Sequence, residues 1–314
     1  MENRCLYCYQ TLEQKEVDYH YKCSEQIFGN AQAPILDFGS ETIKELAKSH
    51  INRRATITGV QPKLSLEIEQ YIQGSGQNRF TVVGLWGNYI LKPPVKQYPF
   101  LPEIEDLTMH LAKIAGIQTA EHALIRLKSG ELAYITKRFD RSSGHKLAME
   151  DMCQLTETLT ENKYKRSMEK VGKEILKHCT NPIFDAIRFF ELTVFCYLTG
   201  NADMHLKNFS LLTNDKQEII FSPAYDLVAT KLVTPEDTEE MAIPLNAKKS
   251  KLKRKDFLIF GERMRLNPKT IGNSLNHIFE KVPDILKFIQ FGFLPDKIKS
   301  SYRDLIEERF QKIS

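Results

Sequence analysis

The stretch GNADMHLKNFS, residues 200–210, contains an Asp at position 203 and an Asn five residues later, at position 208. This is the spacing of a phosphoryl-transfer catalytic loop, in which a carboxylate accepts the proton of a substrate hydroxyl and an amide holds Mg²⁺ against the phosphates of ATP. Surface turns also pair Asp with Asn for backbone hydrogen bonding, so the spacing alone is a weak signal. If the loop is catalytic, Asp203 is the candidate base and Asn208 a candidate magnesium ligand.

A second acid follows this loop, inside an apolar segment. Residues 219–228, IIFSPAYDLV, indicate a short strand, a turn marked by Pro223, and then Asp226. A carboxylate among apolar neighbours requires a cation or strong hydrogen-bond donors nearby. Asp226 is therefore the candidate second magnesium ligand, and the alternative is an ordinary solvent-facing Asp in a turn.

A lysine and an acid upstream complete the pattern. Lys92 ends the apolar run 88–92 and is followed by two prolines, which resembles the strand lysine that contacts ATP phosphates in kinases. A helix is predicted over 102–115, with three acids in its first turns, and of these Glu105 is the expected partner of Lys92. The alternatives are a solvated lysine and three acids that simply favour the start of a helix.

One Gly-containing turn lies between two extended runs before this lysine. Residues 59–64 read GVQPKL, where Gly59 would allow close backbone approach to a phosphate and Lys63 adds a positive charge. The segment matches neither Gly-rich phosphate-loop pattern, and a plain hairpin turn would look much the same.

Taken together and in this order, these segments resemble the HipA family of serine/threonine kinase toxins of bacterial toxin–antitoxin modules. The resemblance covers nearly the whole chain and includes the KRFDR run at 137–141 and the EDMCQ run at 150–154. It implies ATP and Mg²⁺ as cofactors. The roles that it implies are a catalytic base at Asp203 supported by His205, Lys207 and Asn208, magnesium ligands at Asn208 and Asp226, and ATP contacts at Gly59, Gln61, Lys63, Lys92, Glu105, Lys137 and Phe139.

For His205 we expect a hydrogen bond that orients the loop, with packing in the core as the alternative. Full-length members of the family carry a further subdomain before the Gly turn, and only 58 residues precede Gly59 here. This resembles the short HipT kinases of three-gene modules. Those kinases carry paired autophosphorylated hydroxyl residues where this chain has Thr56 and Thr58. Phosphate there would repel ATP, whereas the alternative is two ordinary β-branched strand residues.

The partners that the resemblance implies are an aminoacyl-tRNA synthetase as protein substrate, a HipB-like DNA-binding antitoxin and a small HipS-like protein. Two other functions stay open from the sequence alone. A small-molecule phosphotransferase could use the same loop, and a catalytically silent protein could bind an antitoxin. Exchange of Asp203 for Asn separates a kinase from a binding protein.

A Cys/His pattern stands apart from the kinase motifs. Cys5 and Cys8 form a C-x-x-C pair, and His20 and Cys23 follow after eleven residues. Three thiolates and an imidazole can form a closed tetrahedral zinc site, which would be structural because the protein fills all four positions. The alternative is unmetallated thiols with a chance histidine.

Composition favours a cytoplasmic enzyme. The chain has 314 residues, 42% hydrophobic and 27% charged, with a formal net charge of +4 and no continuous apolar stretch of 18 residues. No secretory leader pattern is present, and Cys153, Cys179 and Cys196 show no disulfide spacing. Membrane association and direct nucleic-acid binding are not expected. The basic run 248–255 indicates a solvated loop, or a docking site for an acidic partner.

The expected fold is α+β: a two-lobed, protein-kinase-like fold with a β-rich N-lobe and an all-helical C-lobe. We expect a Cys/His tip over 1–30, an N-terminal lobe over 31–139 and a C-terminal lobe over 140–314, with ATP between the lobes. Strands are predicted over 56–73, 79–91 and 123–136. Helices are predicted over 40–50, 102–115, 151–159, 168–178, 181–199, 255–264, 269–282 and 296–313.

Overall fold

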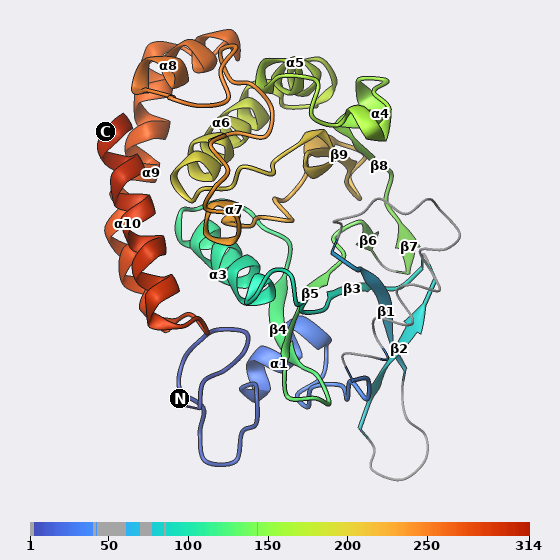
Figure 1. The fold of residues 1–314 in the computed structure, drawn as a ribbon. Helices are drawn as coiled ribbons and strands as arrows, with labels where there is room; N and C mark the ends of the chain where they lie inside the picture. The colour runs from blue at the N-terminus through green and yellow to red at the C-terminus, as the bar shows by residue number, and fades with distance from the viewer. Residues whose placement is uncertain (1–2, 40–41, 43–60, 70–76, 85, 143) are drawn as a thin grey trace. The chain divides into compact units, whose positions relative to one another are not determined.

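The computed structural model describes residues 3–39, 42, 61–69, 77–84, 86–142 and 144–314. The chain divides into two compact units, drawn in Figure 1, and each is described by itself below. The first unit consists of Met1–Asp106, Ala120–Phe139 and Phe291–Phe293. The second consists of Leu107–Thr119, Asp140–Gln290 and Leu294–Ser314. The predicted helix over 40–50 and the turn with Thr56, Thr58 and Gly59 lie outside the described residues, apart from position 42.

An antiparallel five-stranded sheet forms the centre of the first unit, in the order β2-β1-β3-β5-β4. Its strands are β1 (Leu64–Glu69), β2 (Arg79–Val83), β3 (Tyr89–Lys92), β4 (His122–Arg126) and β5 (Leu132–Lys137). The strand predicted over 79–91 is two strands, because the chain turns between Val83 and Tyr89. Gly87 is needed there, since an added Cβ would lie 2.5 Å from the carbonyl oxygen of Leu66. The strand predicted over 123–136 is likewise two strands, β4 and β5, which pair in an antiparallel hairpin.

The N-terminal segment packs on this sheet through the short helix α1 (Tyr21–Phe28). The Phe28 ring meets the Phe80 ring edge to face at 5.7 Å, and Tyr89 donates a hydrogen bond to the carbonyl of Ile27 at 2.9 Å. Alternate residues of β1 and β3, such as Leu66 and Leu91, are fully buried, as the period of two requires. These contacts form one apolar core between the N-terminal segment and the sheet.

Helix α3 (Leu101–Ile114) agrees with the helix predicted over 102–115 and ends at Gly116 in a left-handed conformation, φ 80°. Its residues through Asp106 belong to the first unit, and those from Leu107 to the second. The helix therefore connects the two compact units along the chain.

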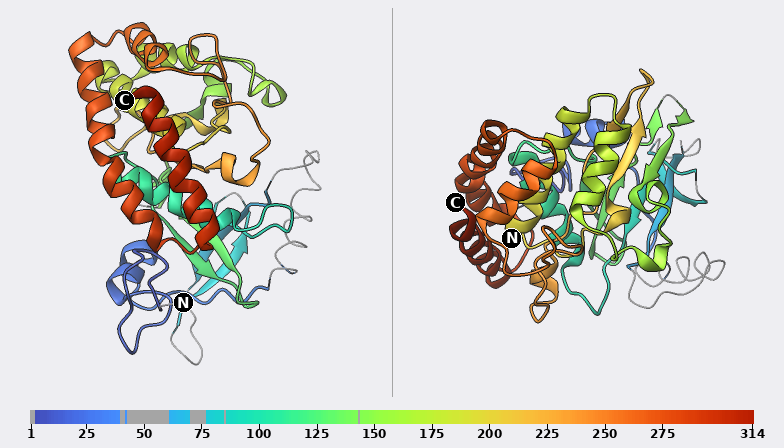
Figure 2. Two further views of the ribbon diagram at one scale, coloured as in Figure 1. Left: turned by 60° about the vertical axis from the view of Figure 1, so that its left-hand side comes forward. Right: turned by 90° about the horizontal axis from the view of Figure 1, so that it is seen from above.

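The second unit is mainly helical, and its centre is α6 (Pro182–Leu198), which contacts α5, α9 and α10. Figure 2 shows α9 and α10 lying side by side. Helices α5 and α10 have the predicted bounds, whereas α9 continues past Pro283, where the prediction ended. The helices are α4 (Met152–Leu155), α5 (Met168–His178), α7 (Thr230–Val233), α8 (Arg254–Arg263), α9 (Pro268–Phe288) and α10 (Asp296–Ile313), with single 3₁₀ turns at Thr160–Asn162, Leu206–Asn208 and Ile289–Phe291.

The prediction of an all-helical C-terminal part was wrong. A three-stranded antiparallel sheet has the order β10-β9-β8, and a separate hairpin pairs β6 with β7. The strands are β6 (Arg141–Ser142), β7 (His145–Lys146), β8 (Met149–Asp151), β9 (Ser210–Thr213) and β10 (Ile219–Phe221). Strands of two to four residues are too short to show a period, and β8 finds its partner about sixty residues away. The helix predicted over 151–159 shrinks to the four residues of α4.

No helix in the described ranges is both long enough and apolar enough to cross a membrane.

Candidate active site

The predicted ion pair between Lys92 and Glu105 is present in the first unit. Lys92 is the last residue of β3, and its Nζ contacts the Glu105 carboxylate on α3. Both side chains are buried, at 5% and 0% exposure. The Lys92 ammonium also lies 5.3 Å from the centre of the Tyr134 ring, on the neighbouring strand. Strand pairing and the aromatic face together hold this cation in place.

The three acids at the start of α3 have three different environments. Glu103 is partly buried, and burial raises its pKa to about 7. Glu105 pairs with Lys92, whereas Asp106 accepts hydrogen bonds from Tyr9 and His122, each at 2.7 Å. The alternative that all three merely favour the helix start is therefore excluded for Glu105 and Asp106, which are fully buried.

In the second unit, the predicted catalytic loop folds back on itself. The 3₁₀ turn Leu206–Asn208 brings Asn208 toward Asp203, so that Asn208 Nδ2 donates to the Asp203 carbonyl at 3.3 Å. The Asp203 side chain is exposed and accepts a hydrogen bond from Tyr164 at 2.7 Å. Asn208 itself is buried. The loop thus holds an accessible carboxylate and a fixed amide within a single turn of chain.

His205 lies inside this loop and is buried. Burial lowers its pKa, against the opposing effects of the Asp203 and Asp226 charges, so the ring is neutral at pH 7. Its Nδ1 has no hydrogen-bond partner within the described part of the chain, and its ring meets Tyr164 edge-on at 5.1 Å. The ring packs against Tyr164, and the orienting hydrogen bond expected of His205 stays a prediction.

Lys207 points away from this turn and anchors the loop. Its ammonium contacts the Asp151 carboxylate at 2.7 Å, and Asp151 also accepts from the backbone N–H of Gln154 as the N-cap of α4. The Met152 N–H donates to the carbonyl of Phe209 at 2.9 Å. The EDMCQ run thus holds the loop in place through the Asp151–Lys207 ion pair and the Met152–Phe209 hydrogen bond. Its D-x-x-Q capping pattern was a signal that could have revealed this.

Asp226 follows β10 and takes the left-handed conformation, φ 60°, which is uncommon for a residue with a side chain. The preceding Tyr225 holds it close to the loop, because its hydroxyl bonds both Ser210 Oγ at 2.7 Å and the Lys207 carbonyl at 2.9 Å. The structure therefore connects the Asp226 segment to the loop of Asp203 and Asn208. Sequence reasoning gave no role to Tyr164 or Tyr225, although Tyr225 lies in the segment 219–228 that contains Asp226.

The other predicted ATP contacts lie in the first unit. Gln61 donates to the carbonyl of Pro93, directly after Lys92, at 3.1 Å. Lys63 and Lys137 are exposed at the start of β1 and the end of β5, and Phe139 is half-buried. Gly59 lies outside the described residues.

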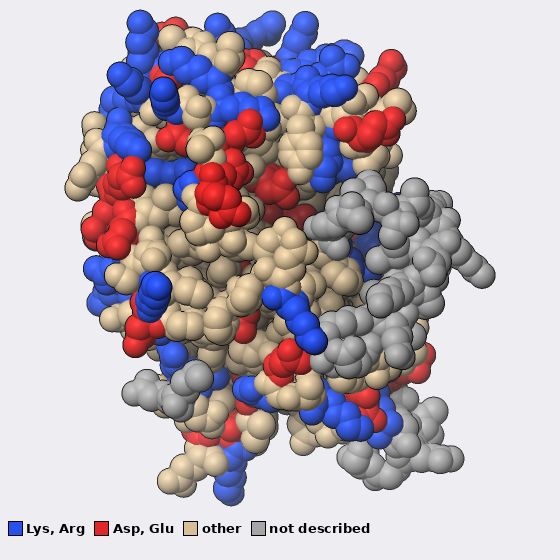
Figure 3. Space-filling view, in the orientation of Figure 1, with Lys and Arg blue, Asp and Glu red and all other residues tan. Residues whose placement is uncertain are grey.

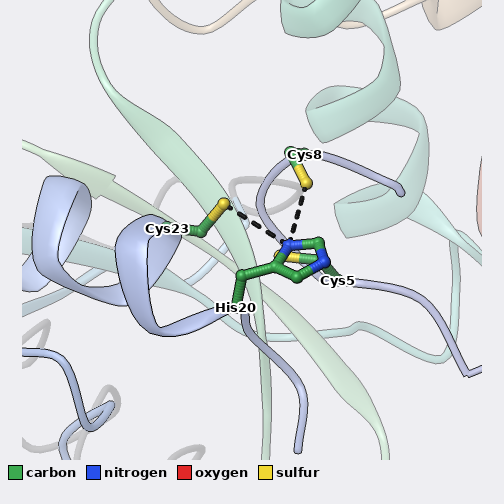
Figure 4. Close-up of side chains that lie close together, drawn as sticks. All are labelled: Cys5, Cys8, His20 and Cys23. Atoms are coloured by element: carbon green, nitrogen blue, oxygen red, sulfur yellow. Dashed lines mark hydrogen bonds between the residues drawn. The ribbon is translucent and has the colours of Figure 1, made fainter. Parts of the chain in front are cut away.

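The structure also brings together the four Cys/His residues at the N-terminus, which Figure 4 shows around the His20 ring. Their candidate ligand atoms all lie within 4.8 Å of one another. A hydrogen bond from the Cys8 thiol lowers the pKa of Cys5 to about 5, against the effect of burial. Backbone N–H groups of Cys8, His20 and Tyr7 also act to lower it.

The basic run 248–255 is only partly a free surface. Figure 3 shows Lys and Arg side chains gathered at the upper end of the second unit, where α8 lies. Lys248 pairs with Asp256 at 2.7 Å and Lys249 with Glu239 at 3.1 Å. A cavity of about 540 Å³ lies beside the rest of the run and includes the Glu240 side chain. Local acids therefore compensate part of the positive charge.

The profile of the HipA-like C-terminal domain matches residues 55–286, a range that contains every kinase motif described above. This chain belongs to the HipA-like C-terminal domain family. The resemblance inferred from the sequence is thereby confirmed.

Two curated relatives of this HipA-family chain carry kinase names. A Haemophilus influenzae protein named putative kinase is 29% identical over 280 residues, which cover 79% of this chain and 80% of that protein. The serine/threonine-protein kinase toxin HipA of Shewanella oneidensis is 26% identical over 258 residues, which cover 74% of this chain but 57% of the toxin.

Solved structures show the same fold. The HipA chain of the Shewanella oneidensis complex of HipA, HipB and operator DNA superimposes with a TM-score of 0.64 at 21% identity. The match covers 82% of this chain and 65% of that one. The Helicobacter pylori proinflammatory kinase CtkA superimposes with a TM-score of 0.54 at 18% identity, over 80% of this chain and 93% of that kinase. The HipA-family chain therefore has a mixed α/β, kinase-like fold.

Proposed function

We propose that this HipA-family protein kinase transfers the γ-phosphoryl group of ATP to a serine or threonine of a protein. The observation that carries the proposal is the turn that joins Asp203 to Asn208. In this turn the Asp203 carboxylate is exposed, whereas the Asn208 side chain is buried and its amide donates to the Asp203 carbonyl. A phosphoryl-transfer site needs positioning and charge stabilisation more than covalent chemistry, and this turn supplies both.

The residues present fit ATP and magnesium. Because Asn208 uses its Nδ2 to donate to the Asp203 carbonyl, its Oδ1 is the atom directed to a cation, and Asp226 adds a carboxylate. Oxygen donors of these two kinds suit Mg²⁺, which when bound neutralises charge on the phosphates. Asp203 would accept the proton of the substrate hydroxyl. Lys92, held by Glu105, would contact ATP phosphates.

The remaining assignments belong to the same proposal. The Shewanella relative is named a kinase toxin, which supports a toxin role for this chain. The structure of the Shewanella HipA with HipB and operator DNA supports a HipB-like antitoxin as partner. By resemblance we further propose the HipT subtype with a small HipS-like partner, growth arrest through phosphorylation of an aminoacyl-tRNA synthetase, and autophosphorylation on Thr56 or Thr58.

The test is incubation of the purified chain with labelled ATP and Mg²⁺, followed by mass spectrometry of the chain and of a lysate. The parent, Asp203→Asn and Asp215→Asn are compared, because Asp215 is an exposed acid of the same unit that bonds only Ser142 and His145 in the described structure. We expect phosphoprotein from the parent and the Asp215 variant, and a loss of roughly 10²–10⁴-fold for Asp203→Asn.

Three results would contradict parts of this proposal. Equal labelling by Asp203→Asn would remove Asp203 as the base. Labelled sugars or alcohols without labelled protein would indicate a small-molecule phosphotransferase. Growth arrest that persists in Asp203→Asn without any labelling would indicate a silent binding protein.

A further inference from the structure

Three separate parts of the N-terminal segment meet at one point. Cys5 and Cys8 come from a turn near the start of the chain, His20 precedes α1, and Cys23 lies in the first turn of α1. The Sγ atoms of Cys8 and Cys23 lie 3.3 Å and 3.7 Å from His20 Nδ1. Tetrahedral zinc with Zn–S of ~2.3 Å and Zn–N of ~2.0 Å places its ligand atoms roughly 3.5–3.8 Å apart. The two sulfur–nitrogen distances lie close to this range, and all four ligand atoms of the cluster in Figure 4 lie within 4.8 Å of one another.

The His20 ring is oriented as a ligand. Its Nε2 lies 3.0 Å from the carbonyl oxygen of Thr11. A carbonyl can only accept, so Nε2 carries the proton and Nδ1 directs its lone pair at the sulfurs. Metal-binding histidines are held in this way, with the far nitrogen donating to a carbonyl or carboxylate. Without a metal, a single lone pair would face three sulfur atoms.

The segment around the cluster has little regular structure of its own. In the described range 3–39, α1 is the only helix, and Arg4 and Thr11 form one isolated bridge. Tyr9 is held at φ 66° although its side chain is fully buried. A bulky residue in this conformation is strained and persists only when its surroundings determine it. A bound metal would supply such a constraint.

Tyr9 follows the ligand Cys8 and reaches the helix that carries Glu105. Its hydroxyl donates to Asp106 Oδ2 at 2.7 Å, and the other oxygen of Asp106 contacts His122 Nδ1 at 2.7 Å. All three side chains are buried. Asp106 is the neighbour of Glu105 on α3, so this hydrogen bond links the residue after Cys8 to the turn of helix that carries the partner of Lys92.

We propose that Cys5, Cys8, His20 and Cys23 bind one structural zinc ion, and that this ion positions Glu105 through the Tyr9–Asp106 hydrogen bond. The site is closed, because all four ligands come from the protein. Tyr9 is a positioning residue. The link to ATP binding rests on the kinase function proposed above, whereas the zinc site does not.

The zinc site is tested by metal analysis of the full chain, purified without chelator. We expect one zinc per chain for the parent and for Cys179→Ala, a cysteine of the second unit with no role in the cluster. Cys23→Ser should lose the metal, and Cys23→His should restore it. Should Cys23→Ser be insoluble, Co²⁺ exchange into the parent gives the visible absorption of a tetrahedral thiolate site. A metal-free parent that also fails to bind added Zn²⁺ or Co²⁺, or a Cys23→Ser variant with full zinc, overturns the site.

The positioning role is tested with Tyr9→Phe, which removes one hydroxyl and no zinc ligand. We expect this variant to keep one zinc per chain and to bind ATP several-fold more weakly. Tyr19→Phe is the matched control, since the Tyr19 hydroxyl bonds the Leu124 carbonyl, not Asp106. Unchanged ATP affinity in Tyr9→Phe would overturn the link to Glu105. A parent that holds zinc but binds no ATP would instead contradict the kinase function and leave the zinc site standing.

Discussion

The ammonium of Lys207 lies 2.7 Å from the carboxylate of Asp151, which is also the N-cap of α4. One acid therefore holds a helix start and the loop of Asp203 at the same time. A neighbouring backbone hydrogen bond from the Met152 N–H to the Phe209 carbonyl reinforces the connection. The candidate catalytic loop is thus anchored to a helix cap in a segment more than fifty residues earlier in the chain.

Replacing Asp151 should separate these two functions. Asp151→Ala loses both the cap and the ion pair, and we expect the free energy of unfolding to fall by about 1–2 kcal/mol. Asp151→Asn keeps a good cap and should lose less than about 1 kcal/mol. Urea unfolding measures both, and kinase activity should fall in both because Lys207 is released. Equal stability losses in the two variants would contradict the capping role.

The buried pair of Lys92 and Glu105 should respond strongly when broken. Lys92→Met leaves a buried carboxylate without its cation, and we expect a loss of about 3–5 kcal/mol in unfolding free energy. Adding Glu105→Gln should recover part of that loss. Lys128→Met is the control, because the Lys128–Asp37 pair is mostly exposed and should contribute less than about 1 kcal/mol. Similar losses for Lys92→Met and Lys128→Met would be inconsistent with a buried pair.

Glu103 should make stability depend on pH. Burial raises its pKa from 4.5 to about 7, so the folded state binds more protons than the unfolded state between these values. The contribution of Glu103 to the free energy of unfolding is therefore fully present below pH 4.5 and is lost as the pH rises through about 7. At pH 8, Glu103→Gln should be more stable than the parent by roughly 1–3 kcal/mol. At pH 4.5 the two should match.

Chemical denaturation across this pH range measures the effect of Glu103. Glu25→Gln is the control, since Glu25 is an exposed acid of the same unit and its charge is not among the causes of the raised pKa of Glu103. A pH slope that survives in Glu103→Gln would mean that another group is responsible.

Gly200 should tolerate no side chain at the start of the candidate catalytic loop. It has φ 73°, and an added Cβ would lie 2.6 Å from Leu305 Cδ2 and 3.1 Å from Lys231 Cβ. Gly200→Ala should lower the free energy of unfolding by about 2–3 kcal/mol, from backbone strain and overpacking together. Gly130→Ala isolates the strain, because Gly130 has φ 87° with open space around it. Thermal or urea unfolding that ranks both variants equally would exclude the clash with Leu305.

Regular elements with a long apolar period could be predicted from the sequence. Helices α5 and α10 have the expected bounds, and α3 and α6 differ by a residue at each end. The short strands of the second unit could not be predicted. Their stability comes from pairing with distant segments, such as Asp151 with Ser210, and not from local propensity.

The sequence by itself carried the resemblance to the HipA family in several short segments, and it placed an acid and an amide at a spacing that one phosphoryl-transfer loop can hold. It also supplied four zinc-type ligands near the N-terminus. Only the tertiary structure decided which of three acids on α3 meets Lys92, and that Asp106 instead receives Tyr9 and His122. Side chains that are adjacent in sequence point in different directions around a helix. A buried carboxylate is costly without a hydrogen-bond or ion-pair partner, so each acid pairs with the groups on its own side of the helix.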